Sequence, residues 1–533
     1  MRIVRIVLAL VLSSTAAASA AAPKTLVFCS KDSPDTFNPQ LSTSAATFDA
    51  SARQVYDRLV MFDPRTWEIT PSLAVSWEIS GNGLEYVIHL RKDVSFHATR
   101  EFRPTRPLNA HDVVFSFNRQ LDRKHPWHRV SGGTYRYFEA LGLDQLIESV
   151  TARDEGTVTF RLARPHASFL AFLAMDFASI LSAEYAQALV EAGAPERLDR
   201  EPVGTGPFRL VQYQRDALIR FAAHRSYWRG VTPLDNLVFA IVPDAGVRLQ
   251  KLRSGECHII DQPDPADLPA LERDPNIRVL RQTNNNLGFL AFNTRRWPLS
   301  DVRIRRALAL AIDREAIIDQ AYEGSGMAAI DALPPSTRRE TAGGIVARPD
   351  SERARRILDE IITEPLRIEI WVPPVDRPYL RNARQIAELI REDWAAIGVE
   401  TSIRVPDWES FLKHSMIGAH QAILFGWVGE TLDPDVFLWP ILSCGSVDSG
   451  ANRSRWCDPA FDRLLEEARR TTGRAARAAI YDAALQRLAE QVPFVPLAHS
   501  LSFTPLRREV TGYTASPLGG HSFYGVDLLR AVP

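Results

Sequence analysis

The hydrophobic and polar positions of this 533-residue chain alternate between the strand period and the helix period, which predicts a mixed α/β protein. Apolar and polar side chains alternate over residues 86–90 and 158–162, as is typical of half-buried strands. Asn109 and Asp112 suit the N-cap and the first turn of a helix. Another helix is expected from about Val302 through Tyr322, with one apolar face formed by Ile304, Leu308, Ala311 and Ile318.

Residues 366–405 show the clearest succession of predicted strands and helices. Residues 366–370 alternate as a strand, and residues 399–405 alternate as another. Gly398 provides a stop for the helix between them, whose apolar positions are Ile386, Ile390, Trp394 and Ile397. The segment therefore predicts a βαβ unit, and a third apolar strand at residues 422–425 follows it.

Two charged residues follow strands of this region. Arg377 lies in the loop after the first strand, and Glu430 lies in the loop after the third. In open α/β sheets ligands bind outside the carboxyl ends of parallel strands, so the two charges converge if these strands are parallel. A guanidinium and a carboxylate facing one cleft suit the carboxylate and the ammonium of a short peptide. The alternative is that both are surface charges, or that they pair with each other.

The first residues predict export. Arg2 and Arg5 precede the apolar run 6–12, and a small-residue stretch ends at Ala20, which is the order of a signal peptide spanning residues 1–20. No later segment has the ~20 apolar residues of a membrane span. Cys29 follows Leu-Val-Phe instead of the small residue that precedes a lipid-modified cysteine. We therefore expect a soluble periplasmic protein that is not a lipoprotein.

Charge and length narrow the class of partner. The chain has 63 Lys and Arg residues against 64 Asp and Glu residues, which gives a formal net charge of −1. Nothing in this balance favours a polyanion, so no nucleic-acid partner is expected. At ~150 residues per domain, the length suggests two to four domains.

Four cysteines in an exported chain form an even set that allows three pairings. We favour Cys444 with Cys457, which lie close in sequence around a loop rich in Gly and Ser, and Cys29 with Cys257. Four buried free thiols are the alternative, and an oxidising compartment disfavours it. No CxxC spacing supports a metal site.

Motifs for catalysis are weak. Gly204 and Gly206 lack the third glycine of a dinucleotide-binding turn, and Ser325 lacks the glycine that a nucleophile elbow needs two positions before the serine. His125 and His128 have HxxH spacing in a turn-like stretch without the HExxH helix, so a structural role is favoured. No catalytic residue, metal or cofactor is predicted. A binding module and a secreted hydrolase of peptides or glycans both remain as function classes.

Several blocks in the same order resemble the large peptide, nickel and oligosaccharide binding proteins of ABC importers, known as solute-binding protein family 5. These blocks are residues 71–78, 86–97, 108–117, 203–208, 226–228 and 301–308. Within the family the chain looks most similar to the periplasmic dipeptide-binding proteins of Gram-negative bacteria. Residues 24–30, 37–40, 175–182 and 377–379 carry that narrower resemblance.

The resemblance implies a periplasmic-binding-protein type II fold, with two hinged α/β lobes and an inserted third lobe. Lobe I would be discontinuous, formed by residues 24–56, 205–283 and 502–533. Lobe II would be inserted at residues 57–204, and lobe III would span residues 284–501. A peptide would be enclosed between lobes I and III by a monomer that delivers it to a membrane permease and its ATPase subunits. Another amine-carboxylate solute, an antimicrobial peptide or a metal chelate is the alternative cargo.

The resemblance also assigns site residues. Arg377 matches the position that pairs with the ligand carboxylate, and Glu430 matches the position where the family uses Asp for the ligand ammonium. Glu430 is one methylene longer than Asp, and three possibilities would accommodate the difference. The pocket is relaxed, the ligand ammonium is smaller or differently placed, or Asp433 binds the ammonium instead. The four cysteines also fall where the dipeptide binders pair them, as favoured above. The predicted ligand-binding set is completed by Tyr379, Trp427 and Gly429, and by the facing loop Thr43, Ser44 and Ala45.

Overall fold

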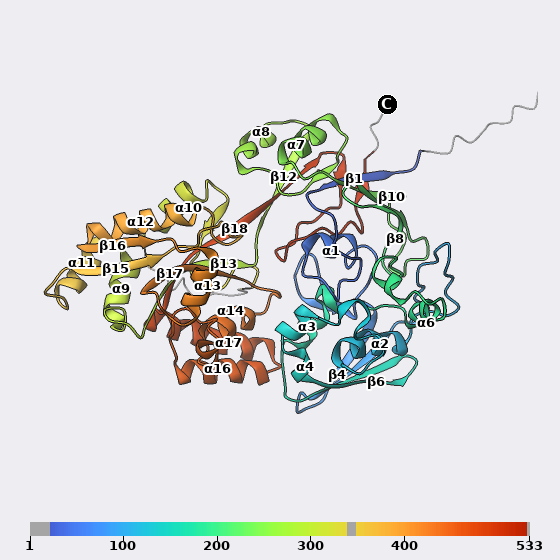
Figure 1. Ribbon diagram of the computed structural model, residues 1–533, viewed down its shortest axis with the longest axis horizontal. Helices are drawn as coiled ribbons and strands as arrows, with labels where there is room; N and C mark the ends of the chain where they lie inside the picture. Colours follow the sequence, from blue (N-terminus) through green and yellow to red (C-terminus); the bar gives the residue numbers. More distant parts are fainter. Residues whose placement is uncertain (1–21, 338–347, 530–533) are drawn as a thin grey trace, which may run out of the picture.

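The computed structural model describes residues 22–337 and 348–529, and the signal peptide predicted at residues 1–20 lies outside these ranges. Figure 1 shows two bodies that long strands join at one end. Buried apolar side chains of residues 287–498 form two clusters of their own, separate from those of the rest of the described chain. We call residues 286–500 the C-terminal lobe and the remainder the N-terminal body. The predicted α/β class is confirmed.

One long sheet runs through both bodies. In the C-terminal lobe its order is β16 (Val399–Arg404), β15 (Leu366–Trp371), β17 (Ala422–Val428) and β13 (Asn286–Phe292). β18 (Phe494–Arg507) follows and leads into the N-terminal body. There the order continues with β11 (Ile259–Ile260), β1 (Thr25–Ser30), β10 (Asn236–Ile241), β9 (Leu218–Ala223) and β8 (Phe208–Gln214).

The central strand β13 is buried at every position because apolar clusters cover both of its faces. Leu290 and Phe292 enter one cluster, whereas Leu287 and Phe289 enter the other. This alternation follows from the two-residue period of a strand. A near-continuous apolar sequence is what a strand covered on both faces requires.

β18 belongs to both bodies. One part of this 14-residue strand pairs with β13, and the other part pairs with β12 (Ile277–Thr283) of the N-terminal body. Asn284 and Asn286 each donate a side-chain hydrogen bond to Ser500 Oγ, at 3.1 and 2.7 Å. The connection between the two bodies therefore consists of β18 and the consecutive strands β12 and β13 that pair with it, and the two side-chain hydrogen bonds lie where β12 passes into β13.

The βαβ unit predicted from the sequence is confirmed. β15 and β16 are parallel, and α12 (Ala383–Ala396) connects them. β15 also pairs in parallel with β17, the third predicted strand. Gly398 follows the helix at φ +84°, a conformation that side chains with a Cβ rarely adopt.

The single helix expected from Val302 through Tyr322 is wrong. The structure has α9 (Val302–Ala311) and α10 (Arg314–Ala321) instead. The break lies at Asp313. Its carboxylate accepts a hydrogen bond from the Ala316 amide, so Asp313 caps the start of the second helix. The apolar spacing continued across the break and concealed it.

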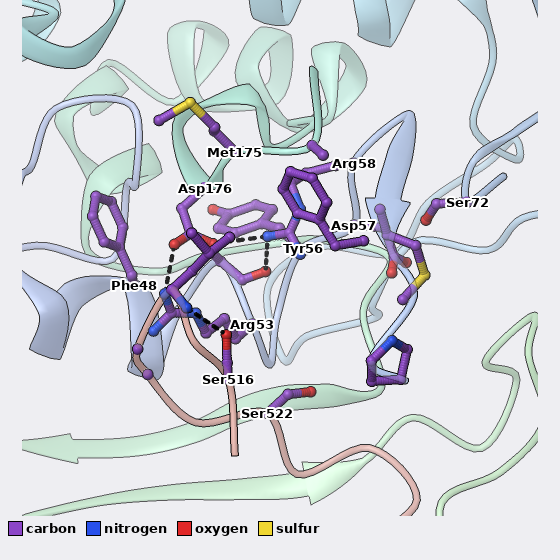
Figure 2. A pocket seen from close by; sticks show the side chains of 18 of the residues that line it. Phe48, Arg53, Tyr56, Asp57, Arg58, Ser72, Met175, Asp176, Ser516 and Ser522 are labelled. Atoms are coloured by element: carbon purple, nitrogen blue, oxygen red, sulfur yellow. Dashed lines mark hydrogen bonds and ion pairs between the residues drawn. The ribbon is translucent and has the colours of Figure 1, made fainter. Parts of the chain in front are cut away.

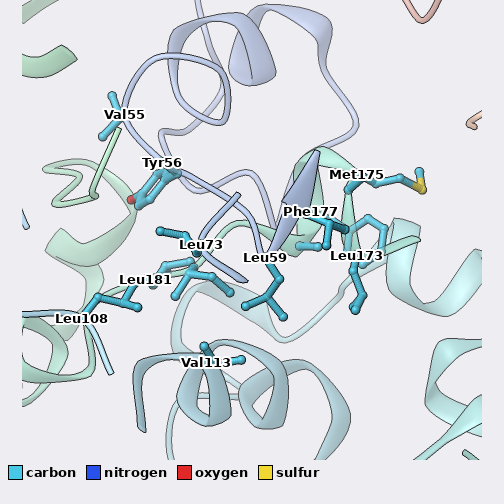
Figure 3. Packing of buried hydrophobic residues seen from close by; sticks show 14 of the residues in the cluster. Val55, Tyr56, Leu59, Leu73, Leu108, Val113, Leu173, Met175, Phe177 and Leu181 are labelled. Carbon is cyan, nitrogen blue, oxygen red and sulfur yellow. The ribbon is translucent and has the colours of Figure 1, made fainter. Parts of the chain in front are cut away.

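The N-terminal body contains a four-stranded antiparallel sheet in the order β4 (Ala74–Ile79), β5 (Glu85–Leu90), β7 (Thr157–Leu162) and β6 (Ile147–Asp154). α2 (Ala110–Leu121) begins with the predicted cap, in which Asn109 and Asp112 form a reciprocal capping box. The main core of this body extends from the 24–56 segment into the 57–204 segment (Figure 3). The boundary between lobes I and II therefore stays a prediction.

Both favoured disulfides are present, Cys29–Cys257 and Cys444–Cys457. The second closes a short loop, and a staple of that size contributes roughly 3 kcal/mol in the chain-entropy model. Among the helices of residues 22–337 and 348–529, none combines the length and the apolar character that a membrane span requires.

Candidate functional site at the carboxyl ends of the parallel strands

A pair of facing glycines positions the loop after β15. Gly288 on β13 lies opposite Gly426 on β17, and Tyr379 packs against both. A Cβ on Gly426 would come within 2.1 Å of Tyr379 Cδ2, and a Cβ on Gly288 within 2.3 Å of the Tyr379 carbonyl oxygen. Tyr322 fixes that carbonyl by donating a 2.7 Å hydrogen bond from its hydroxyl. The absence of a Cβ at these two glycines thus leaves the space in which the loop that carries Arg377 packs against the sheet.

Arg377 is half-buried among aromatic rings. Its guanidinium carbon lies 5.0 Å from the centre of the Trp408 ring and 5.9 Å from that of Tyr379. The Nε atom is buried without a hydrogen-bond partner, and the side chain forms no ion pair with any residue of the described ranges. Aromatic faces attract a guanidinium but do not neutralise it, so this charge remains available to an anion.

Glu430 follows β17 and contacts the N-terminal body. Burial raises the pKa of its carboxyl, and the nearby Asp176 carboxylate adds to the increase. The Tyr137 side chain, on α3 (Arg136–Ala140), donates a hydrogen bond that acts in the opposite direction. No ion pair with an arginine or lysine of the described chain offsets the burial. A cation at this position would relieve the cost of ionising Glu430.

Asp433, three residues further on, has a different environment. Its carboxylate is buried and accepts hydrogen bonds from Arg477 at 2.5 and 2.8 Å. Burial opposes its ionisation, but Arg477 outweighs burial and lowers the pKa of Asp433 below its usual value. Because its charge is already neutralised inside the lobe, Asp433 is a weaker candidate than Glu430 for the ammonium partner.

A cavity of about 340 Å³ opens beside Glu430, lined by the N-terminal body and by residues 428–430. Figure 2 shows Asp176 in this cavity between Arg53 and Arg58. Each arginine forms an ion pair with the Asp176 carboxylate at 2.9 Å. Arg53 also pairs with Asp49 at 2.5 Å, so these two arginines and two aspartates neutralise one another, in contrast to Arg377 and Glu430.

Trp427 and Gly429 form the strand end before Glu430. The Trp427 indole donates a 2.7 Å hydrogen bond to the Val436 carbonyl, and the ring is half-buried against the core of its lobe. Gly429 donates its amide to Asn285, whose side chain in turn donates to the Gly429 carbonyl, both at 2.8 Å. A Cβ at Gly429 would lie 2.4 Å from Phe437. Both residues set the path of the backbone, and their contact with ligand stays a prediction.

The predicted facing loop precedes α1 (Ala45–Ala50). Thr43 and Ala45 are exposed, and Ser44 occupies the N-cap position without a side-chain capping bond. Further along this helix, Phe48 packs against Tyr137, with 5.8 Å between ring centres. The loop is thus connected through Phe48 and Tyr137 to Glu430. Direct contact between Thr43, Ser44 or Ala45 and a ligand stays a prediction.

Sequence reasoning missed four residues of this region. Tyr137 and Asp176 approach Glu430 from the N-terminal body, and Arg453 approaches Phe425 from the disulfide-closed loop. Asn285 binds the carbonyl oxygens of Gly429 and Thr431 at the start of the C-terminal lobe. The run of three asparagines between two strands was a signal for Asn285. Asp176 lies in the 175–182 block of the resemblance, but no local pattern marked it, Tyr137 or Arg453 as a site residue.

The described residues contain no group of three or more His, Cys, Asp or Glu side chains that could hold a metal ion. The His128 Nδ1 atom donates a 2.8 Å hydrogen bond to the Arg119 carbonyl inside the core, which agrees with the structural role favoured for it.

Two α/β bodies that share paired strands, with unpaired charges at the sheet edge beside their contact, define a hinged two-lobe binding protein. The chain belongs to the bacterial extracellular solute-binding proteins, family 5, whose middle-region model matches residues 68–449.

Relatives agree with this assignment over nearly the whole chain. The dipeptide-binding protein of Escherichia coli (strain K12) is 45% identical over 515 residues, which is 96% of each chain. Heme-binding protein A of Haemophilus influenzae is 44% identical over 513 residues, 96% of this chain and 93% of that one.

Two solved structures confirm the predicted periplasmic-binding-protein fold. HbpA2 from Haemophilus parasuis is 40% identical and has a TM-score of 0.92, with 95% of this chain and 100% of that chain covered. A dipeptide-binding protein from Pseudoalteromonas sp. SM9913 in complex with Met-Leu is also 40% identical over the same shares, with a TM-score of 0.74.

Proposed function

We propose that this protein is the exported binding component of an ABC importer, and that it captures dipeptides or other short peptides. The observation that carries the proposal is that Arg377 and Glu430, each in a loop that follows one of two parallel strands of the same sheet, have no oppositely charged partner in the described chain. Similarity over 96% of the chain to the dipeptide-binding protein of E. coli supports the same ligand class.

The chemistry of a peptide backbone fits both charges. Arg377 would bind the terminal carboxylate through its two-pronged guanidinium, while the Trp408 ring keeps that group in place. Glu430 would bind the terminal ammonium, and the positive charge would lower the raised pKa of its carboxyl. The longer side chain of Glu, relative to the Asp of the dipeptide binders, would suit an ammonium further from the strand end.

Capture would proceed by movement of the two bodies about the paired strands β12, β13 and β18. A ligand that contacts both bodies shifts the balance toward the closed arrangement. Glu430 and Tyr137 already connect the two bodies beside the cavity, which supports this part of the site as the place of closure. The lobe boundaries would be those predicted from the sequence, with residues 57–204 inserted into lobe I.

The protein would act in the periplasm as a monomer that meets a membrane permease and its ATPase subunits. Two observations support a processed, unlipidated form. The sequence of residues 1–20 has the order of a cleaved signal peptide. Cys29 is fully buried and bonded to Cys257, so its sulfur is occupied.

Mass spectrometry of small molecules released from denatured, freshly purified protein tests the ligand class. We expect short peptides, and calorimetry with the peptides found should give saturable binding at one site. Recovery of sugars alone would contradict the proposal. A retained heme absorbance band after desalting would make heme the cargo instead.

The same samples separate binding from hydrolysis. A binding protein returns its peptide unchanged after prolonged incubation, whereas a hydrolase of peptides or glycans releases fragments. Accumulation of free amino acids in proportion to protein concentration would show turnover and contradict the binding role.

A further inference from the structure

A second arginine without an anionic partner lies beside an aromatic ring that neighbours one of those around Arg377. Arg453 is 7% exposed, and its guanidinium carbon lies 4.7 Å from the centre of the Phe425 ring. Phe425 and Tyr379 have ring centres 6.3 Å apart. Arg377 faces the Tyr379 ring of this pair, and Arg453 faces Phe425. Two cations therefore flank two neighbouring rings.

The Arg453 guanidinium has no neutralising group within the described part of the chain. Its Nε and Nη1 atoms are buried without hydrogen-bond partners, and no carboxylate pairs with it. Burial lowers the pKa of Arg453 to about 10, although the Tyr379 phenol favours the charged form. A buried cation without a partner is costly, so an anion that reached it would be bound favourably.

The backbone around Arg453 is fixed. The loop is closed by the Cys444–Cys457 disulfide, and His420 donates a 2.8 Å hydrogen bond to the Arg453 carbonyl. Asn452 donates further hydrogen bonds to the carbonyls of Ser443 and Trp456, at 3.2 and 2.8 Å. A loop held in this way presents its charged group in a defined place, which a specific binding site requires.

We infer that the site prefers peptides with a second carboxylate, and that Arg453 binds it. The inference rests on the proposed peptide-binding function. A neutral dipeptide satisfies Arg377 and Glu430 but leaves Arg453 unpaired. A net charge of −1 on the ligand therefore complements two arginines and one glutamate. Because both arginines flank adjacent rings, the second carboxylate belongs to the side chain of the residue that carries the terminal carboxylate.

Four dipeptides test this assignment by calorimetry: Ala-Glu, Ala-Gln, Glu-Ala and Gln-Ala. We expect Ala-Glu to bind at least about tenfold more tightly than Ala-Gln, as a charge-assisted hydrogen bond to a buried partner should provide. Glu-Ala and Gln-Ala should differ by less than about threefold, since their acidic position lies at the Glu430 end. Equal affinities of Ala-Glu and Ala-Gln for the unaltered protein would overturn the inference.

Arg453→Met should remove the preference for Ala-Glu and leave the affinity for Ala-Gln within about threefold, and Arg453→Lys should restore part of it. Arg455→Met is the matched control, because it removes the same charge from the same loop, where the Arg455 side chain donates hydrogen bonds to the backbone carbonyls of Met416 and Val447. Thermal unfolding of each variant shows whether it is folded. A preference that persists in folded Arg453→Met contradicts the role of Arg453, and failure of all four peptides to bind refutes the proposed function as well.

Discussion

Two regions of the C-terminal lobe differ in whether their charged side chains have oppositely charged partners. In the loops that follow β15 and β17, Arg377 and Glu430 have no oppositely charged partner in the described chain. At the contact with the N-terminal body, α17 (Arg474–Gln491) supplies Arg477, which pairs with the buried Asp433. The same contact includes a 3.2 Å hydrogen bond from Arg477 to Ser168. Both regions are partly buried, so exposure to water does not explain the difference.

The comparison indicates what each set of charges does. A buried pair with two hydrogen bonds holds its surroundings together, and loss of one partner leaves a costly isolated charge. An unpaired charge contributes no such stability and instead costs free energy until a ligand arrives. Substitutions in the first region should therefore affect ligand affinity, and those in the second should affect folding.

Asp433→Ala should give the largest effect, a loss of about 3–5 kcal/mol of unfolding free energy, because it leaves Arg477 buried without its partner. Denaturant unfolding monitored by tryptophan fluorescence measures it. Asp482→Ala, on the exposed side of α17, is the control and should change stability by less than about 0.5 kcal/mol. Unchanged stability together with lost peptide affinity would instead assign Asp433 to the ligand.

Arg377→Met should weaken dipeptide binding by about 2–5 kcal/mol, since the ligand carboxylate would be buried without a charged partner. Its unfolding free energy should change far less than that of Asp433→Ala, because no residue of the described chain pairs with Arg377. Calorimetry with one dipeptide across both proteins provides the comparison. Arg384→Met removes an equal charge from the exposed side of α12 and should bind peptide normally. Equal affinity of Arg377→Met and the unaltered protein would contradict the proposed role.

Glu430→Gln should separate affinity from stability most clearly. We expect peptide affinity to fall by about 1.5–3 kcal/mol through loss of a charged hydrogen bond, while stability at neutral pH stays the same or rises slightly. The reason is that a raised pKa in the folded state favours the protonated carboxyl. The stability from Glu430 is thus present below its unfolded pKa and lost as pH rises through the folded value.

Glu430 and Asp433 should also differ in how pH changes peptide affinity and stability. Peptide affinity should fall as pH decreases through the raised pKa of Glu430, because the ammonium then loses its carboxylate. Asp433 behaves in the opposite sense: its pKa is lowered, so its stability is present above the unfolded pKa and is lost as pH falls through the folded value. Calorimetry between about pH 4 and pH 7 measures the change in affinity, and unfolding experiments extended below the ordinary aspartate pKa of about 3.9 measure the change in stability. Affinity that is independent of pH in this range would contradict an ammonium contact at Glu430.

The sequence predicted the local elements of this region well. Periodicity placed the βαβ unit and the third strand, and their parallel pairing is confirmed. The two disulfides were predicted from compartment, spacing and resemblance. The break between α9 and α10 was missed because Asp313 interrupts the backbone without interrupting the apolar pattern.

The surroundings of the charges could not be predicted in this way. Tyr137 and Asp176 reach Glu430 only through the arrangement of the two bodies, which no local pattern specifies. Which carboxylate meets an arginine is likewise a tertiary property: Asp433 and Glu430 lie in one loop, yet only Asp433 faces α17. The direct ligand contacts of all the predicted site residues stay predictions.

The glycine pair under Tyr379 offers a way to inactivate the site without altering any charge. A single methyl group at Gly426 would meet the Tyr379 ring at 2.1 Å, so the whole loop would have to lift from the sheet. The guanidinium of Arg377 would then be displaced while its chemistry stayed intact. The position of this charge thus depends on two residues that have no side chain. Substitution of either glycine would abolish binding as effectively as loss of the arginine itself.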